Sequence, residues 1–491
     1  MPMAVRKPVI TAGKQGVIYG LGNIFNKLAS FLLIPLYTLF LPTSVVGILI
    51  LIELFENLLV NFLPYGVAYG MWEKLKKEPK KKFQSFPSAF YSSLIATSVA
   101  VILLYLSRGL FVGFLGIPIE ISWVYNLILL NILFNVQIRV FLWFIQYEGK
   151  AIQFIALSFI QFAGTLFLSI LFVVYQGKGL EGFILGKFIS YLIIFAGCLL
   201  YTLLKYPKTI DFYRYKSMLQ FGFPLMVLGL THPVLTILDR FVMRMVELPL
   251  DQIGIYSVGY KFGMIINMVL VIPMQRVWSP MMFKLGLEDK NLQYHRDFLL
   301  YYSIIGMSLF VGMLLFSREM LGLVTTVSYD SAATIIPIIT LAYFFHGYRI
   351  FFQAGAALTG KTWNLIFIPL ITVSVSGSIN YVLILWHGVI GAAVATLLSY
   401  ILLDIIVYVV SSRSLYIEWN WKKLANLYVL VGIIVYIFFS FLLPQDGKTL
   451  LFEKSILLIA FFIGLIILRI VGLRELNSIK WIIQKILKVN P

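Results

Sequence analysis

The sequence predicts an all-α polytopic membrane protein. The chain has 491 residues, of which 60% are hydrophobic and 12% charged, and its mean hydropathy is +0.93. Soluble domains carry about 25% charged residues, so a soluble fold is excluded. The apolar residues form continuous runs instead of alternating with polar ones, which favours membrane helices over a membrane barrel.

Fourteen apolar runs are long enough to cross a bilayer, because a hydrocarbon core of about 30 Å needs roughly 20 helical residues. They cover 17–40, 45–70, 88–107, 122–147, 152–175, 183–204, 219–240, 253–277, 298–316, 332–353, 363–386, 388–411, 424–443 and 452–473. The connections between them are too short for a soluble catalytic domain. We therefore expect the helices to carry the function and the protein not to be an enzyme.

The positive charges predict the orientation. Most of the 39 Lys and Arg fall in the connections on the same side as the N-terminus. By the positive-inside rule, both termini then lie in the cytoplasm. The net charge of +18 reflects this topology and attraction to membrane lipids, so no nucleic-acid partner is expected.

Neither a metal nor a cofactor is predicted. Cys198 is the only cysteine and lies inside an apolar run, which excludes disulfides and thiolate metal sites. Residues 355–362 match the P-loop pattern, but they lie between two apolar runs with no strand before them. We interpret this segment as a connection between helices.

A weak internal repeat predicts the architecture. Pro42–Lys74 and Leu250–Lys284 both begin with a turn followed by a glycine, Gly47 and Gly254 respectively. Both continue as one apolar run that contains a late proline and ends at a lysine. The two segments hold the second and eighth runs, so the repeating unit is six helices. Six is even, and the two halves should be related by a pseudo-twofold axis along the membrane normal.

The predicted domains follow from this repeat. Residues 1–205 form an N-terminal six-helix bundle, residues 206–413 a second one, and residues 414–491 two further helices with a basic cytoplasmic tail. Two bundles that face one another across a cleft are typical of a transporter.

Cations within the apolar runs indicate the ligand. Lys27, Arg139 and Lys261 each lie inside a run. A charge at that depth costs roughly 2.5–3.5 kcal/mol on insertion scales. Such residues need a counter-charge or a functional role. Several of them together suggest that the protein binds an anion within the bilayer.

Polar residues at helical spacing accompany these cations. The predicted binding residues, which are the three cations with neighbouring amides and one aromatic ring, are Lys27, Asn23, Arg139, Asn135, Lys261, Tyr260 and Asn57. A structural interpretation stays open for each. Lys27 could neutralise Glu53 or Glu56, Arg139 could pair with Glu148, and asparagines often join helices by hydrogen bonds.

Other charged residues in the runs have different predicted roles. Glu53, Glu56 and Asp404 are candidates for carrying a coupling ion, although Asp404 could also pair with a neighbouring cation. Asp239 and Arg240, near the outer end of the seventh run, are candidates for a gate or a structural cap. His346 and Arg349 are expected at the membrane interface.

Three stretches resemble the polysaccharide flippases of the multidrug/oligosaccharidyl-lipid/polysaccharide exporter superfamily. They are Phe31–Gly47 with its PLYT segment, Phe221–Pro280 with FGFP, LDRFVM, IGIYSVGYKF and VWSP in order, and Asn380–Tyr400 with GVIGAAVA. The family usually has an arginine after Tyr-Thr, whereas Leu39 stands here. No role can be carried over for that arginine.

The resemblance implies a function. It predicts that the chain flips a polyprenyl-diphosphate-linked oligosaccharide from the inner to the outer leaflet of a prokaryotic cytoplasmic membrane by alternating access. Expected partners are membrane lipids and the polysaccharide polymerase and chain-length machinery, and the protein is expected to be a monomer. The alternatives are a multidrug/cation antiporter of the same superfamily, a flippase for the peptidoglycan precursor lipid II, and a polysaccharide polymerase. The last would need a large outer loop that the chain lacks.

Overall fold

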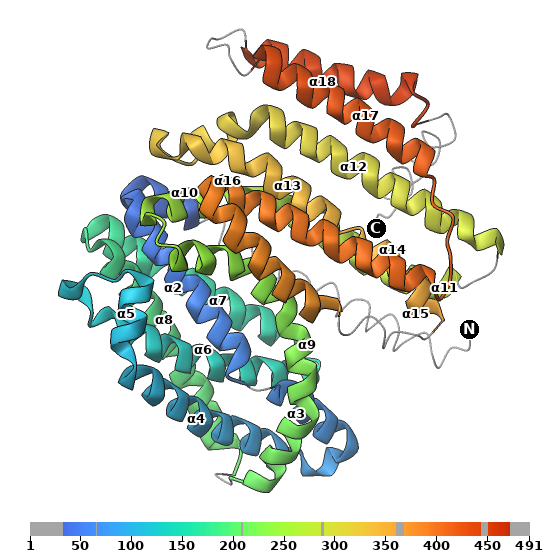
Figure 1. Ribbon diagram of the computed structural model, residues 1–491. Coiled ribbons are helices and arrows are strands. Elements are labelled where there is room, and N and C mark those ends of the chain that lie inside the picture. Colours follow the sequence, from blue (N-terminus) through green and yellow to red (C-terminus); the bar gives the residue numbers. More distant parts are fainter. Residues whose placement is uncertain are drawn as a thin grey trace, which may run out of the picture. The chain divides into compact units, whose positions relative to one another are not determined.

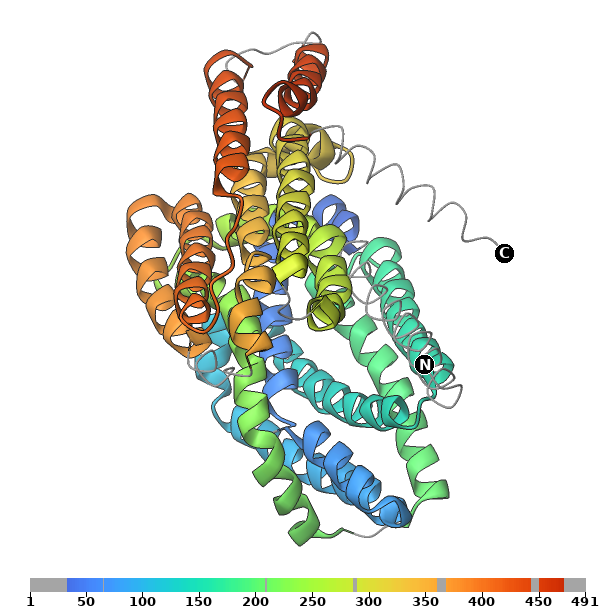
Figure 2. The same cartoon turned by 90° about the vertical axis from the view of Figure 1, so that its right-hand side faces the viewer.

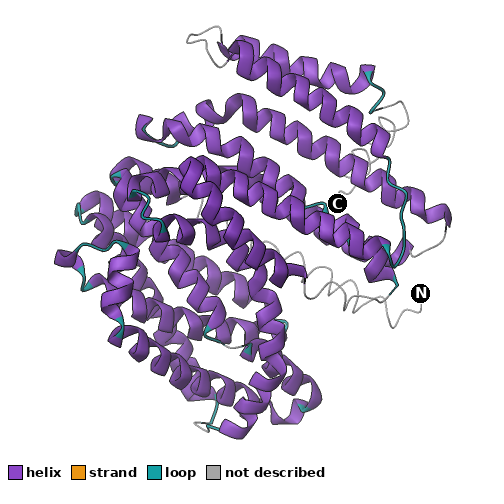
Figure 3. Cartoon of the chain, viewed as in Figure 1, coloured by secondary structure: helices purple, strands orange, loops and turns teal. Residues whose placement is uncertain are grey.

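The computed structural model describes residues 33–64, 66–207, 210–285, 289–359, 368–442 and 450–471. Within these ranges the regular elements are all helical (Figure 3). Ten helices of the described part are long and apolar enough to cross a membrane. The predicted multi-pass helical membrane protein is thus confirmed. Lys27 and Asn23 lie outside the described residues.

The chain forms two compact units. The first consists of Met1–Val258, Val324–Tyr329 and Pro369–Ala392, and the second of Gly259–Leu323, Asp330–Ile368 and Ala393–Pro491. The predicted domain limits at residues 205 and 413 stay a prediction.

Consecutive helices build most of the first unit (Figure 1). They are α2 (Thr43–Phe62), α3 (Val67–Lys77), α4 (Lys82–Leu106), α5 (Arg108–Leu115), α6 (Val124–Tyr147), α7 (Ala151–Ile170), η3 (Leu171–Tyr175), α8 (Gly179–Lys205), α9 (Phe212–Met245) and the start of α10 (Leu250–Gly263). The π-helical turn η3 continues α7 to the end of the predicted run. Residues 33–40 are also helical.

Helix α6 is the most enclosed element of the first unit. Its buried residues are spread around the helix and include polar as well as apolar side chains. It packs against α2, α4 and α8, and 72% of its most apolar window is buried. Near the end of α6, the ring of Phe144 stacks on Phe86 of α4 with 4.0 Å between centroids. This close packing of α6 against its neighbours therefore holds its polar side chains in place.

An ion pair joins the connection after α3 to the beginning of α9. Asp211 caps α9 by accepting a hydrogen bond from the backbone N–H of Arg214 at 2.9 Å. The Arg214 side chain donates to Glu78 at 3.0 Å and to Ser85 at 3.1 Å. This hydrogen bond lowers the pKa of the Glu78 carboxyl below its usual value. The connection after α3 is anchored to α9 in this way.

The two glycines that open the internal repeat meet where α2 crosses α10. A β-carbon on Gly47 would lie 1.9 Å from the carbonyl oxygen of Leu250, and one on Gly254 would lie 2.3 Å from that of Thr43. Small residues let helix backbones approach this closely. Beyond what the repeat predicted, its two copies contact each other directly.

The close approach predicts a strong penalty for a single methyl group. Gly47→Ala should lower the free energy of unfolding by about 1–3 kcal/mol, because the backbone must move to relieve the clash. Thermal melting of the purified protein in detergent measures the change. Gly197→Ala in α8 is the matched control, since a β-carbon there meets nothing within 4 Å. Equal melting temperatures for the two variants would contradict the prediction.

The second unit contains the rest of the helices. They are η4 (Asn267–Val271), α11 (Ile272–Leu285), α12 (Asp289–Gly322), the end of η5 (Val327–Thr334), α13 (Ile335–His346), α14 (Arg349–Phe352), α15 (Ala354–Leu358), most of the later part of α16 (Ile368–Ser412), α17 (Trp421–Ile437), η7 (Phe438–Leu442) and α18 (Leu450–Ile467). Helices α17 and α18 lie side by side (Figures 1 and 2). Lys454 of α18 donates to Glu319 of α12 at 2.6 Å.

Helix α16 joins two of the predicted runs, 363–386 and 388–411. The two helical parts meet at Gly388, whose φ of 55° and ψ of −131° are not helical. Glycine adopts a positive φ without the steric cost that other residues meet there. The break therefore falls at the first residue of the second run, next to the single residue that separates the two runs.

Candidate functional site

A polar cavity lies within the first unit, among α2, the three consecutive helices α6, α7 and α8, and the helical segment 33–40. Its volume is about 310 Å³. It is lined by Leu33, then Glu53, Glu56 and Asn57 of α2, Asn135, Arg139 and Leu142 of α6, Gln161, Phe162 and Thr165 of α7, and Phe183, Lys187 and Tyr191 of α8. Ligand pockets usually measure about 300–1,000 Å³, so a small charged group fits the space.

The acidic residues of the cavity have partners. Glu56 forms an ion pair with Lys187, and both side chains are largely buried. Glu53, one turn earlier on α2, accepts a hydrogen bond from the hydroxyl of Tyr37 at 2.7 Å. Two carboxylates so close together repel each other, and a neighbouring ammonium offsets this repulsion. The ion pair neutralises Glu56, whereas Glu53 keeps its negative charge while it accepts the hydrogen bond.

Arg139 is held differently. Its guanidinium donates to the amide oxygen of Asn61 at 2.8 Å. Among the described residues, no carboxylate lies within ion-pair distance of Arg139. Glu148 pairs instead with Lys150 at 3.7 Å, so the alternative pairing with Arg139 is wrong.

A guanidinium has five N–H groups, and one neutral amide neutralises none of its charge. Placed at a cavity wall, this group can bind a phosphate oxygen pair in a bidentate way. The arrangement therefore provides a cationic end for an anionic ligand, with asparagine and glutamine side chains beside it.

The structure brings several of the predicted residues together. Asn57, Asn135, Arg139, Glu53 and Glu56 come from two helices far apart in the sequence and line one cavity. Their predicted roles in binding and coupling stay predictions.

The sequence analysis missed Lys187 as a member of this group. The signal was present, because Lys187 is a charge inside the apolar run 183–204, as Arg139 is inside its own. Its pairing with Glu56, across 131 positions, could not be inferred from spacing along one helix.

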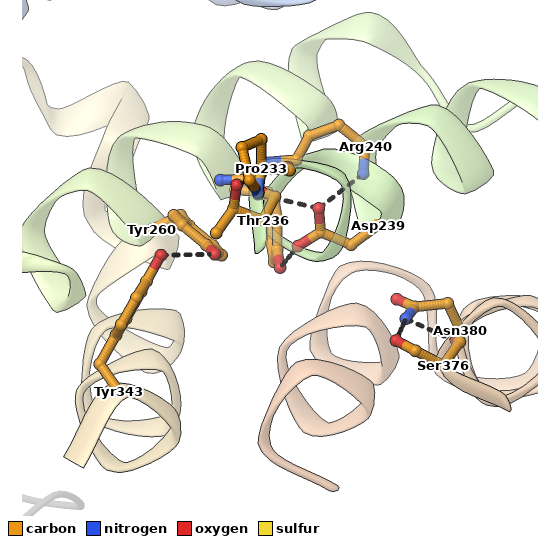
Figure 4. A network of polar contacts seen from close by, with 9 residues as sticks. Pro233, Thr236, Asp239, Arg240, Tyr260, Tyr343, Ser376 and Asn380 are labelled. Carbon is orange, nitrogen blue, oxygen red and sulfur yellow. Dashed lines mark hydrogen bonds and ion pairs between the residues drawn. The ribbon is translucent and has the colours of Figure 1, made fainter. Parts of the chain in front are cut away.

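The gate candidates form a buried cluster of their own in the first unit (Figure 4). Asp239 is 1% exposed and accepts a hydrogen bond from the Arg240 guanidinium at 2.8 Å and another from Tyr256. Arg240 also donates to the carbonyl oxygen of Thr236 at 2.6 Å. On α16 the amide of Asn380 donates to Ser376. The Asp239–Arg240 pair is thus held by contacts within the first unit, and its predicted role as a gate or cap stays a prediction.

The remaining predicted residues belong to the second unit. Lys261 is partly buried near the end of α10. Tyr260 is 3% exposed and shares a hydrogen bond of 2.9 Å with Tyr343, so its ring packs inside the unit (Figure 4). Asp404 is 3% exposed on α16. His346, expected at the membrane interface, is buried against Tyr400.

Comparison with known proteins places this geometry in context. A family model described as "Polysaccharide biosynthesis protein" matches residues 12–286. A search of the curated proteins finds no match.

Solved structures with the same fold are transport proteins. A structure of the lipid II flippase MurJ in an inward closed conformation superposes with a TM-score of 0.75 at 15% identity, covering 92% of this chain and 99% of that one. An inward-facing multidrug resistance transporter of the MATE family, in the MOP superfamily, gives 0.64 at 12% identity, covering 79% and 94%. A Vibrio cholerae MATE transporter gives 0.54 at 13% identity, covering 83% and 98%. At these identities the likeness establishes the fold.

Proposed function

The chain belongs to the polysaccharide biosynthesis protein family, and from this premise we propose that it flips a polyprenyl-diphosphate-linked oligosaccharide across the cytoplasmic membrane. The substrate moves from the cytoplasmic to the outer leaflet during the synthesis of a surface polysaccharide. Both termini lie in the cytoplasm, and the protein acts as a monomer beside the polymerase and chain-length machinery.

The position of the Arg139 guanidinium is the main support for this proposal. It lies at the wall of a membrane-embedded cavity, and its hydrogen bond goes to a neutral amide. A diphosphate offers the negative oxygens that such a group binds best. The volume of about 310 Å³ accommodates the diphosphate and the first sugar, while the rest of the glycan needs further space. The surrounding amides suit sugar hydroxyls.

Alternating access completes the mechanism. The cavity receives the diphosphate head from the inner leaflet, while the lipid tail stays in the bilayer. Rearrangement of the two units then exposes the head to the outside. An inside-negative potential favours the outward movement of an anion by about 2.3 kcal/mol per charge per 100 mV.

A multidrug/cation antiporter is the second candidate, and Glu53 and Glu56 in the cavity favour it. Such a protein needs an acidic binding site. Here Glu56 is neutralised by Lys187, and the positive charge of Arg139 offsets the negative charge of Glu53, so the lining is not acidic overall. The flippase is therefore the better supported function. A lipid II flippase shares the diphosphate chemistry and differs only in the glycan.

Reconstitution tests the proposal. Vesicles containing the full chain receive a fluorescent polyprenyl-diphosphate trisaccharide, and an impermeant lectin reports its appearance in the opposite leaflet. We expect flipping that is faster than in protein-free vesicles. Because Arg139 should recognise two phosphates, the matching monophosphate lipid should be flipped more slowly.

Two further experiments distinguish the flippase from the alternative functions. Lipid II in the same vesicles tests the glycan preference. Ethidium efflux from cells that express the chain tests the antiporter. Efflux of ethidium without any flipping of the diphosphate lipid would overturn the proposed function.

A further inference from the structure

A buried carboxylate also lies in the second unit, far along the chain from the residues of the cavity. Asp404 of α16 is 3% exposed. Both of its carboxylate oxygens are buried and accept no side-chain hydrogen bond from a described residue, although the backbone N–H of Arg349 interacts with them. An ionised carboxylate with so little support is very costly in a low-dielectric interior, so this group needs a cation or a proton.

The groups that interact electrostatically with Asp404 come from three other helical segments. They are Tyr302 of α12, Tyr348 and Arg349 at the beginning of α14, and Tyr428 of α17. On α16 itself, Tyr400 lies one turn earlier and packs on His346 of α13 with 4.6 Å between ring centroids.

The hydroxyls of Tyr302, Tyr348 and Tyr428 have other partners. Tyr302 donates to the carbonyl oxygen of Phe344 at 2.7 Å. The hydroxyl of Tyr348 shares hydrogen bonds with Ser303, at 2.7 Å, and with Tyr428. These hydroxyls are therefore not available to stabilise a negative charge on Asp404.

Arg349 is close enough to attract the carboxylate, yet the described side chains of Arg349 and Asp404 form no ion pair. A proton satisfies this arrangement better than a metal ion. A metal ion would be repelled by the guanidinium and would need several oxygen ligands, whereas a proton removes the buried charge outright. When the proton leaves, the carboxylate can move towards Arg349.

We propose that Asp404 is a proton-binding site of the second unit, and that proton binding and release there are coupled to the transport step. The coupling rests on the proposed flippase function, but proton binding does not. A proton that enters from outside neutralises Asp404, and its release to the cytoplasm lets the carboxylate pair with Arg349. One proton is bound and the same proton is released in each cycle.

Infrared difference spectroscopy of the full chain in lipid vesicles tests proton binding directly. The wild-type protein should show the carbonyl band of a buried, protonated carboxylic acid. Asp404→Asn should lose this band. Asp330→Asn, which changes an exposed carboxylate in η5, should keep it. An unchanged band in Asp404→Asn would overturn the inference.

Arg349→Gln provides a second variant in case Asp404→Asn fails to fold. Removing the guanidinium should shift the loss of the band to higher pH, because a nearby cation favours the ionised carboxylate. A band that disappears at the wild-type pH in this variant would contradict the proposed pairing.

Transport vesicles then test the coupling. With an imposed pH gradient, flipping of the diphosphate lipid by the wild-type chain should accelerate, and Asp404→Asn should lose this acceleration. Binding of inorganic pyrophosphate should be the same in both proteins. If the wild-type chain flips the lipid at the same rate with and without the gradient, the coupling is overturned. If it flips no lipid under any condition, the proposed function is overturned instead.

Discussion

Replacing Arg139 with glutamine is expected to weaken the binding of inorganic pyrophosphate by about 10- to 100-fold and to abolish flipping of the diphosphate lipid. A hydrogen bond to a charged group contributes about 1.5–3 kcal/mol, and each 1.4 kcal/mol corresponds to a factor of ten in affinity. Glutamine also removes the charge, so the loss should reach the upper part of this range. Calorimetric titration of the purified protein measures the binding.

Two control variants separate charge from geometry. Arg139→Lys keeps the positive charge but loses the planar fork, so its affinity should fall between those of the wild type and Arg139→Gln. Asn61→Ala removes the amide that orients the guanidinium and should weaken binding less than Arg139→Gln. Wild-type affinity in Arg139→Gln would show that the cavity does not bind the diphosphate through this residue.

The membrane helices could be predicted because hydropathy acts over long segments. The run 122–147 corresponds to α6 (Val124–Tyr147), and the run 183–204 to α8 (Gly179–Lys205). The residue at which α9 begins was harder to predict from hydropathy. This helix begins at Phe212, seven residues before its run, because its first two turns are polar and bind the segment around Glu78.

The partners within the site could be predicted only in part. The spacing along α2 and α6 indicated that Glu53 and Asn57, and likewise Asn135 and Arg139, share a helix face, and these residues do line one cavity. Which residue meets which depends on how the helices pack together. The pairing of Glu56 with Lys187 and that of Arg139 with Asn61 are therefore results of the tertiary structure.

Replacing Lys187 with methionine is expected to destabilise the protein by about 3–5 kcal/mol, because the buried Glu56 carboxylate then loses its counter-charge. Glu53, one turn away on the same helix, adds to the penalty through repulsion. The yield of folded protein after detergent extraction and the melting temperature both report the loss. Glu56→Gln should also destabilise the protein, because it leaves the Lys187 ammonium buried without an anion.

The double variant Glu56→Gln with Lys187→Met should recover most of the lost stability. Neutral residues of similar size often replace a buried ion pair at little cost, so the two substitutions are not additive. Additive losses in the double variant would contradict a direct pair. Pyrophosphate binding by the recovered protein then assigns the role of Lys187. Retained binding would identify Lys187 as structural and leave Arg139 as the main phosphate ligand, while weakened binding would make Lys187 a second cation at the diphosphate.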